Sequence, residues 1–247
     1  PSGRIDAGET YLIYGRSNGL PALITLNSTW LDGTNGVIFA GANMNDQCGY
    51  SVSSAGDVNG DGLADVLMGA KGADPLGRNI AGETYLVYGR SNGLPSLIKM
   101  DSTWLNGTNG VILAGAVAMN WCGVSVSSAG DVNDDGYADM LAGANFASPF
   151  GHDAAGETYL IYGRSNGFPA LITMTNTWLD GSNGVILAGA AASDNSGKWV
   201  SSAGDVNGDG ASDLLVGALY ADPSGRTNAG ETYLVYGRSN GLPALIT

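Results

Sequence analysis

The sequence predicts an all-β protein built from tandem four-stranded antiparallel blades of the β-propeller type. The first observation behind this is a repeat of 74 residues: the segment Ala-Gly-Glu-Thr-Tyr begins at Ala7, Ala81, Ala155 and Ala229. The second is that each repeat contains four short runs of strand-forming residues bounded by Gly, Asn and Asp, without a long 3.6-residue period. Four short strands repeated in tandem are typical of propeller blades.

In the first complete repeat the four strands are expected at residues 50–54, 65–69, 83–88 and 111–114. The segment 90–110 is less regular, with turn signals, a short apolar piece at Leu97 and Ile98, and Trp104. Common blades have about 40–50 residues, so we expect the additional length to lie in this connection before the fourth strand. A β-solenoid is the alternative architecture, but its coils are usually much shorter.

The domain organisation that follows is a single repeat array. It consists of a partial repeat at 1–47, complete repeats at 48–121 and 122–195, and a partial third repeat at 196–247. Residues 7–25 and 229–247 differ only at Ile13 and Val235, so the chain begins and ends inside a repeat. Because closed propellers have about 4–8 blades, we expect either a fragment of a longer array or an array completed by neighbouring copies.

Composition narrows the possible partners. Lys and Arg total 10 against 23 Asp and Glu, which gives a formal net charge of −13. Such a surface repels nucleic acid and anionic lipid, and no apolar run approaches the ~20 residues of a membrane span.

Cys48 and Cys122 occupy one repeat position, which is Ser196 in the third copy. Two buried thiols are favoured over a disulfide, which would need a close approach of neighbouring repeats.

The motif Asp-x-Asn-x-Asp-Gly-x-x-Asp carries the chemistry. Oxygen donors at alternate positions of a tight loop can converge on one hard cation, and Ca²⁺ takes six to eight oxygens. The residue after the Gly can add its backbone carbonyl. The sequence therefore predicts three Ca²⁺ sites: Asp57, Asn59, Asp61, Leu63 and Asp65; Asp131, Asn133, Asp135, Tyr137 and Asp139; Asp205, Asn207, Asp209, Ala211 and Asp213.

These loops are not EF-hands, because position 12 holds Met68, Ala142 or Val216 rather than Glu, and the last Asp opens an apolar strand. They are interpreted as turns between two strands. An Asx-rich turn without metal is the alternative, although three clustered carboxylates would then repel one another. Ca²⁺ is favoured over Mg²⁺, which usually keeps several waters. Asp134 replaces the Gly of the other copies and is expected to face solvent.

The motif resembles the FG-GAP repeats of integrin α-chain propellers and of long secreted bacterial repeat proteins. The Gly-Ala pair follows the motif at Gly69, Gly143 and Gly217, and the resemblance covers essentially the whole chain. In departure from the family pattern, Cys48, Cys122 and Ser196 stand where the Phe would be. The resemblance implies a propeller-type fold and Ca²⁺ sites, but not integrin ligand binding.

Outside the Asp-rich loops, Trp, Glu and Arg residues also recur at fixed positions of the repeat. Trp30, Trp104 and Trp178 share one repeat position and either stack on sugar rings, as in a lectin, or pin the long connection to the blade. Glu9, Glu83, Glu157 and Glu231 open one strand of each repeat and are explained either by solvation at a sheet edge or by a cross-strand pair with an arginine, for which the candidates are Arg16, Arg90, Arg164 and Arg238. His152, the one histidine, is expected to be a solvated loop residue rather than a catalytic base.

Together these features predict a non-enzymatic, extracellular or cell-surface module that Ca²⁺ stabilises. Its expected partners are a protein or glycan surface ligand, or further copies of itself in a larger propeller or filament. A carbohydrate-binding propeller that uses the recurring Trp is the alternative. A hydrolase whose catalytic part lies elsewhere is a third hypothesis, which no residue of this sequence supports.

Overall fold

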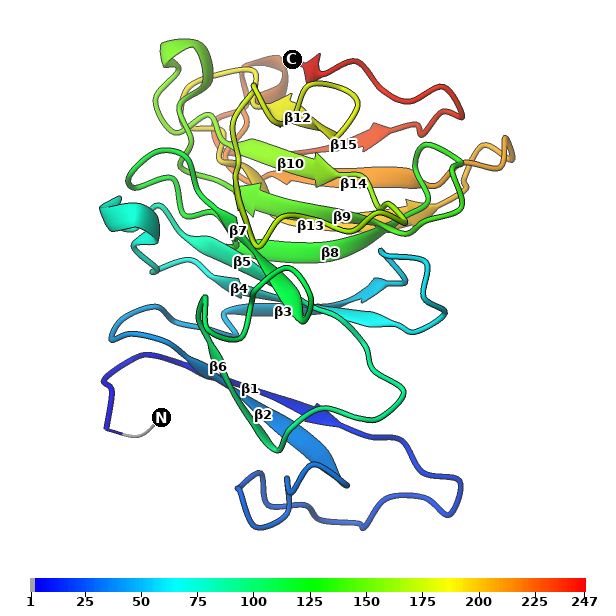
Figure 1. Ribbon diagram of the computed structural model, residues 1–247. Helices are drawn as coiled ribbons and strands as arrows, with labels where there is room; N and C mark the ends of the chain where they lie inside the picture. Colours follow the sequence, from blue (N-terminus) through cyan, green and yellow to red (C-terminus); the bar gives the residue numbers. More distant parts are fainter. Residues whose placement is uncertain (1–2) are drawn as a thin grey trace.

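Four β-sheets stacked face to face make up the protein (Figure 1). The computed structural model describes residues 3–247. In spatial order, the first sheet consists of β1 (Glu9–Ile13), β2 (Gly36–Gly41) and β6 (Leu97–Met100). The second sheet consists of β11 (Leu171–Thr173), β7 (Gly110–Ala114), β5 (Glu83–Val87), β4 (Asp65–Ala70) and β3 (Ser51–Gly56), and the third of β16 (Leu245–Ile246), β12 (Gly184–Ala188), β10 (Glu157–Ile161), β9 (Asp139–Ala144) and β8 (Ser125–Gly130). The fourth sheet consists of β13 (Ser196–Gly204), β14 (Asp213–Ala218) and β15 (Glu231–Val235).

The predicted all-β class and the four antiparallel strands of each repeat are confirmed. Strands β3, β4, β5 and β7 pair in sequence order and lie within two residues of the expected ranges. Within the described residues the helical elements are three short 3-10 turns, η1 (Pro75–Gly77), η2 (Pro149–Gly151) and η3 (Pro223–Gly225). The sheets form an open stack rather than a closed ring (Figure 1).

The long connection also lies where it was expected, before the fourth strand, but it does more than link. Part of it forms a fifth strand that pairs in parallel with the sheet of the preceding repeat. Strand β6 pairs with β2, β11 with β7, and β16 with β12. Each repeat thus contributes one strand to its neighbour, a pairing that the sequence did not reveal.

The hydrophobic core lies between the sheets, in three layers. Strand β4 shows why: Leu67 packs into the layer between the second and third sheets, whereas its neighbour Met68 packs into the layer between the first and second. Successive side chains of a strand point to opposite faces, so a sheet covered on both faces needs apolar residues at both. This accounts for the continuous apolar run of β4.

Small residues dominate the strands at the inner edge of the stack, β3, β8 and β13. They let neighbouring sheets approach closely enough for direct hydrogen bonds between blades. The Ser51 hydroxyl donates to the Gly123 carbonyl at 2.9 Å, and the Ser128 hydroxyl donates to the Ala55 carbonyl at 3.0 Å. The repeated Ser-Val-Ser-Ser-Ala-Gly segment is therefore an inter-blade packing surface.

The two cysteines confirm the thiol interpretation. Cys48 and Cys122 are free and buried, and burial raises the pKa of each thiol to about 12. Such thiols are unreactive at neutral pH because the nucleophilic form is the thiolate. Among residues 3–247 the structure has no helix with the length and apolarity that crossing a bilayer requires.

Candidate metal loops, recurring tryptophans and an inter-blade pocket

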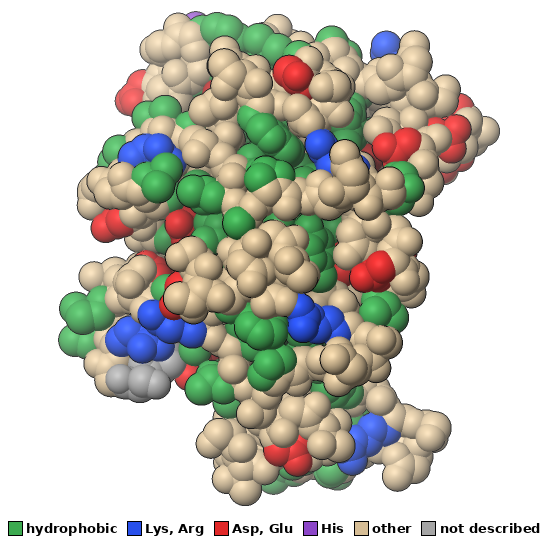
Figure 2. Space-filling view, viewed as in Figure 1, with side chains coloured by type: hydrophobic (Ala, Val, Ile, Leu, Met, Phe, Trp, Pro, Cys, Tyr) green, Lys and Arg blue, Asp and Glu red, His purple; other side chains and the backbone are tan. Residues whose placement is uncertain are grey.

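The three Asp-rich loops connect β3 to β4, β8 to β9 and β13 to β14, so they are strand-to-strand turns, as predicted. They lie along one side of the stack, on the right in Figure 1, and Figure 2 shows acidic side chains exposed on that side. The 3-10 turns lie on the opposite side, because each follows the far end of the strand that the Asp-rich loop begins. One side of the molecule therefore gathers all the predicted metal ligands.

The first loop is shaped by its own carboxylates. Asp57 accepts hydrogen bonds from the backbone N–H groups of Gly60 at 2.8 Å, Asp61 at 3.1 Å and Gly62 at 2.8 Å. Asn59 Nδ2 donates to Asp61 Oδ2 at 3.2 Å. Gly62 has a φ of +86°, in the left-handed region that favours glycine. These contacts hold the oxygen donors of Asp57, Asn59 and Asp61 within one tight turn.

The last Asp of each motif has a different place. Asp65 is buried, and its two carboxylate oxygens accept the N–H groups of Val58 at 3.0 Å and Gly89 at 2.8 Å. It therefore ties the loop to the segment that follows β5. Burial, together with the nearby Asp61 and Asp57 carboxylates, raises the pKa of Asp65 to about 6, although the two N–H groups act to lower it. Asp139 makes the same pair of bonds, and burial raises its pKa to about 8.

The third loop repeats this geometry, and the second differs from it at Asn133 and Asp134. Asn133 Oδ1 is buried without a hydrogen-bond partner, whereas Asn59 Oδ1 accepts the Asp61 N–H at 3.0 Å. Asp134 is exposed with a φ of +58°, so the prediction that it faces solvent is confirmed. The backbone N–H groups of Leu63, Tyr137 and Ala211 donate to the carboxylates of Asp61, Asp135 and Asp209. In the second loop, Asp131 accepts the Gly136 N–H, as Asp57 accepts the Gly62 N–H in the first. In the third loop, Asp205 accepts the Gly210 N–H, Asn207 donates to Asp209, and Asp213 accepts the Val206 N–H.

The donor set fits Ca²⁺ in its chemistry, since all side-chain donors are carboxylate or amide oxygens. Among residues 3–247, however, no three His, Cys, Asp or Glu side chains already form a metal cluster. The carboxylate oxygens face loop N–H groups, although each oxygen has a second lone pair. Among the side-chain donors predicted for the three loops, Asn133 Oδ1 is the one buried atom without a hydrogen-bond partner.

The loops also join neighbouring blades. The Ala138 N–H donates to the Asp57 carbonyl at 3.0 Å, and the Arg164 N–H donates to the Val58 carbonyl at 2.8 Å. A Cβ added to Gly60 would lie 2.4 Å from the Tyr137 ring. The equivalent bonds from Ser212 and Arg238 link the second loop to the following repeat. The first and second loops are thus hydrogen-bonded directly to the next blade.

The recurring tryptophans are half-buried and lie beneath arginines. The guanidinium carbon of Arg16 lies 5.9 Å from the ring centre of Trp30, that of Arg90 5.3 Å from Trp104, and that of Arg164 5.5 Å from Trp178. Trp104 and Trp178 also pack against the core layers. This arrangement favours the packing interpretation over stacking on a sugar ring.

The expected pairing of the recurring Glu and Arg residues is wrong. Glu83 accepts a hydrogen bond from the Tyr85 hydroxyl at 2.7 Å, and Glu157 from Tyr159 at 2.7 Å. Residues two apart on a strand share a face, which brings each Tyr to its Glu. Arg16, Arg90 and Arg164 lie over the recurring tryptophans instead.

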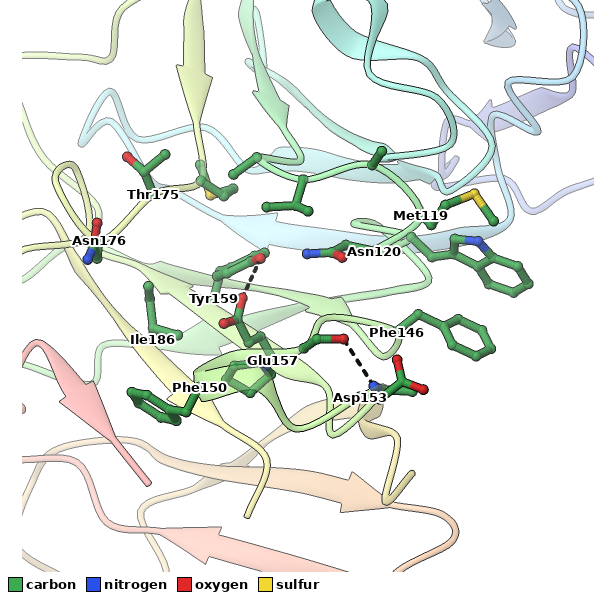
Figure 3. A pocket seen from close by; sticks show the side chains of 18 of the residues that line it. Met119, Asn120, Phe146, Phe150, Asp153, Glu157, Tyr159, Thr175, Asn176 and Ile186 are labelled. Carbon is green, nitrogen blue, oxygen red and sulfur yellow. Dashed lines mark hydrogen bonds between the residues drawn. The ribbon is translucent and has the colours of Figure 1, made fainter. Parts of the chain in front are cut away.

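A pocket of about 930 Å³ lies between the second and third sheets, at the side opposite the Asp-rich loops (Figure 3). Its walls are the connection after β7 and the segment around η2, with Trp121, Phe146 and Phe150 among the lining side chains. Trp121 does not recur at its position in the other repeats. The signal that could have found the pocket is this difference between repeats.

The sheets and loops define a class: a tandem array of propeller-type blades in which an Asp-rich turn opens the second strand of each repeat. The FG-GAP repeat family matches residues 49–87, 123–161 and 199–235, each match running from the first strand of a blade through the third. The chain is therefore an FG-GAP repeat protein.

Similar proteins carry integrin and phospholipase names. The chain is 32% identical over 178 residues to phosphatidylinositol-glycan-specific phospholipase D of Bos taurus, covering 72% of this chain and 19% of that protein. It is 29% identical over 203 residues to integrin alpha pat-2 of Caenorhabditis elegans, covering 82% and 15%. It is 30% identical over 190 residues to integrin alpha-5 of Xenopus laevis, covering 74% and 16%. The chain thus spans less than a fifth of each relative.

Proposed function

We propose that this chain is a non-enzymatic interaction module in which Ca²⁺, one ion per Asp-rich loop and three in all, stiffens the joints between blades. The observation that carries the proposal is the double use of the loop. Each loop holds four side chains with oxygen donors in one turn, and the carbonyls of Asp57 and Asp131 accept N–H groups from the next blade.

The bound ion would neutralise clustered carboxylates and cross-link the loop. Without it, the three Asp side chains of each loop repel one another, and only loop N–H groups offset this repulsion. Ca²⁺ suits the site better than Mg²⁺, because a loop of this kind offers many protein oxygens in a flexible arrangement. Fixing the loop would also fix the inter-blade hydrogen bonds of its first two carbonyls.

An extracellular or cell-surface location is part of the proposal. Loops of this kind suit the millimolar Ca²⁺ outside cells, and two of the relatives named above are integrin α-chains. The expected partner is a protein or glycan surface ligand; self-association into a longer array is a further prediction from the repeat. The resemblance to a phospholipase does not extend the proposal to catalysis, since the match covers 19% of that protein.

Thermal unfolding with and without Ca²⁺ tests the proposal. A ligand that binds only the folded state stabilises by about 2.7 kcal/mol per site at a concentration 100 times its Kd. We therefore expect several millimolar Ca²⁺ to raise Tm above its value in EDTA, and elemental analysis to find up to three Ca²⁺ per chain. Equal concentrations of Mg²⁺ serve as the control and should raise Tm less. Identical melting curves in Ca²⁺ and EDTA, with no metal bound, would overturn the proposal.

A further inference from the structure

The inter-blade pocket described above is lined by residues in which the repeats differ. Trp121 and Phe150 are aromatic only in the central copy, whereas Phe146 has an aromatic counterpart in the following copy but not in the preceding one. The corresponding residues are Gln47, Gly72 and Leu76 in the preceding copy, and Asn195, Tyr220 and Ser224 in the following copy. The strands around them are nearly identical between repeats. The fold therefore does not require these aromatic side chains, and a separate explanation is needed for them.

A carboxylate lies in the pocket wall. Glu157 is half-buried at the start of β10, lines the pocket and accepts the Tyr159 hydroxyl, as Figure 3 shows. Burial raises its pKa, and the Tyr159 hydrogen bond lowers it. Within the described residues no Lys or Arg is ion-paired with Glu157; the one ion pair there joins Lys99 and Asp101. Its charge is thus desolvated without a cation beside it.

The equivalent carboxylate of the preceding repeat, Glu83, has an arginine in its surroundings, although among the described residues the two do not form an ion pair. Burial raises the pKa of Glu83, while the Tyr85 hydrogen bond and the Arg78 guanidinium lower it. Arg78 Nε donates to the Gly115 carbonyl at 2.9 Å, which holds the guanidinium at this place. One repeat later, the residue at the Arg78 position is His152.

His152 does not replace the guanidinium. The imidazole is exposed, its Nδ1 lies 3.1 Å from the Ala190 carbonyl, and it does not line the pocket. Two carboxylates near Glu83, Asp46 and Asp74, are likewise replaced by neutral side chains in the central repeat. Glu157 is therefore left as a single desolvated carboxylate, with Asp153 as a second one at the exposed rim.

We infer that this pocket binds an organic ammonium cation on an apolar body, which supplies near Glu157 the positive charge that Arg78 supplies near Glu83. The cation would be neutralised by Glu157, and its apolar body would contact the rings of Phe150, Phe146 and Trp121. Aromatic faces attract desolvated ammonium groups by about 2 kcal/mol each, and ligand pockets commonly have volumes of roughly 300–1,000 Å³.

Other cations near the pocket leave room for this ligand. Lys71 Nζ lies 3.9 Å from the Tyr50 ring centre and 4.2 Å from that of Trp121, and Lys71 is not among the residues that line the pocket. The site is also independent of the proposed Ca²⁺ loop, because the two lie at opposite ends of β9, roughly 20 Å apart for a six-residue strand.

The test uses matched probes. Binding is measured by isothermal titration calorimetry or by NMR chemical-shift perturbation, in EDTA and in Ca²⁺, so that failure here and failure of the Ca²⁺ proposal are distinguishable. Choline represents a free quaternary ammonium, and Nα-acetyl-lysine methylamide represents a protein side chain. The control, 3,3-dimethylbutan-1-ol, has the shape of choline without its charge. We expect at least one cation to bind at least about tenfold more tightly than the control, and the tighter one identifies the source.

Two test variants, Glu157→Gln and His152→Arg, and one control variant, Glu83→Gln, locate the site. Glu157→Gln keeps the shape and removes the charge, so it should weaken cation binding about tenfold or more; Glu83→Gln, the same change one repeat earlier, should not. His152→Arg restores the cation of the other repeats and should abolish binding. Circular dichroism verifies that the variants fold. Equal binding of the uncharged alcohol, unchanged affinity in Glu157→Gln, or no cation binding to the folded wild type would each overturn the inference.

Discussion

At the scale of residues, the last Asp of each motif is both a predicted metal ligand and a buried acceptor of backbone hydrogen bonds, and the sequence alone indicates only the first role. The pattern marks Asp65 as one of several metal ligands. The structure shows it buried, with both oxygens accepting backbone N–H groups from the loop and from the end of β5. Asp61, in the same loop, is exposed and contacts only its own turn. The two carboxylates should therefore respond differently to substitution.

We predict that Asp65→Asn destabilises the protein by about 1–3 kcal/mol in EDTA at pH 7.5, because an amide cannot accept both N–H groups. Asp61→Asn should cost less than about 1 kcal/mol under the same conditions. In Ca²⁺, both variants should bind one ion fewer than the wild type. Urea denaturation in each buffer measures the free energy of unfolding. Equal losses in EDTA would show that Asp65 has no structural role beyond that of Asp61.

Residue-scale predictions from the sequence succeeded where the answer was local. The exposed Asp134 and the free thiols of Cys48 and Cys122 needed only turn chemistry and side-chain type. The predicted pairing of Glu with Arg is wrong because the Tyr85 hydroxyl, two residues further along the strand, donates to the Glu83 carboxylate. The sequence does not reveal this contact. Likewise, Trp121 carried no signal until the fold placed it beside Phe146, with ring centres 4.5 Å apart.

At the scale of elements, the fifth strand is the main feature that the sequence did not disclose. Strand β11 has only three residues, yet it extends the sheet of the preceding repeat through parallel pairing with β7. Ile172 is 2% exposed within the core, and its neighbour Leu171 is 41% exposed. A strand this short has too little alternation to be recognised, and its partner is about 60 residues away.

Truncation of this strand tests its contribution. Ile172→Ala should destabilise the protein by about 2–5 kcal/mol, because the buried side chain would leave a cavity between two sheets. Leu171→Ala, on the exposed face of the same strand, is the matched control and should change stability by no more than about 1 kcal/mol. The midpoint of urea denaturation reports both. A small effect of Ile172→Ala would mean that the connection is only loosely docked on the preceding blade.

At the scale of the whole molecule, stability depends on contacts between blades rather than on any single sheet. The core lies in three layers between sheets, and backbone hydrogen bonds cross from the first and second Asp-rich loops to the next repeat. In repeat proteins, stability is approximately the sum of repeat and neighbour-interface terms. A disturbance at one loop should therefore weaken the joint with the following blade.

Two glycines at one repeat position isolate this joint. Gly60 and Gly208 have φ values of +73° and +78°, but a Cβ on Gly60 would meet the Tyr137 ring, whereas one on Gly208 would have no neighbour within 4 Å. Gly208→Ala should cost about 1–2 kcal/mol of backbone strain. Gly60→Ala should cost about 1–3 kcal/mol more, from the clash with the next blade. Differential scanning calorimetry checks this, and Tyr137→Ala in the Gly60→Ala background should remove the excess.

The repeat, the four antiparallel strands of each blade, the place of the Asp-rich turns and their donor chemistry could all be predicted from the amino-acid sequence. These features follow from local patterns, since strand alternation, Gly-bearing turns and residue spacing lie within about ten residues of one another. The features that depend on neighbouring blades became visible in the folded structure: the fifth strand, the hydrogen bonds from one loop to the next repeat, and the aromatic pocket around Glu157. Those contacts join residues of different repeats, and near-identical repeats give a single sequence no means of showing which copies touch.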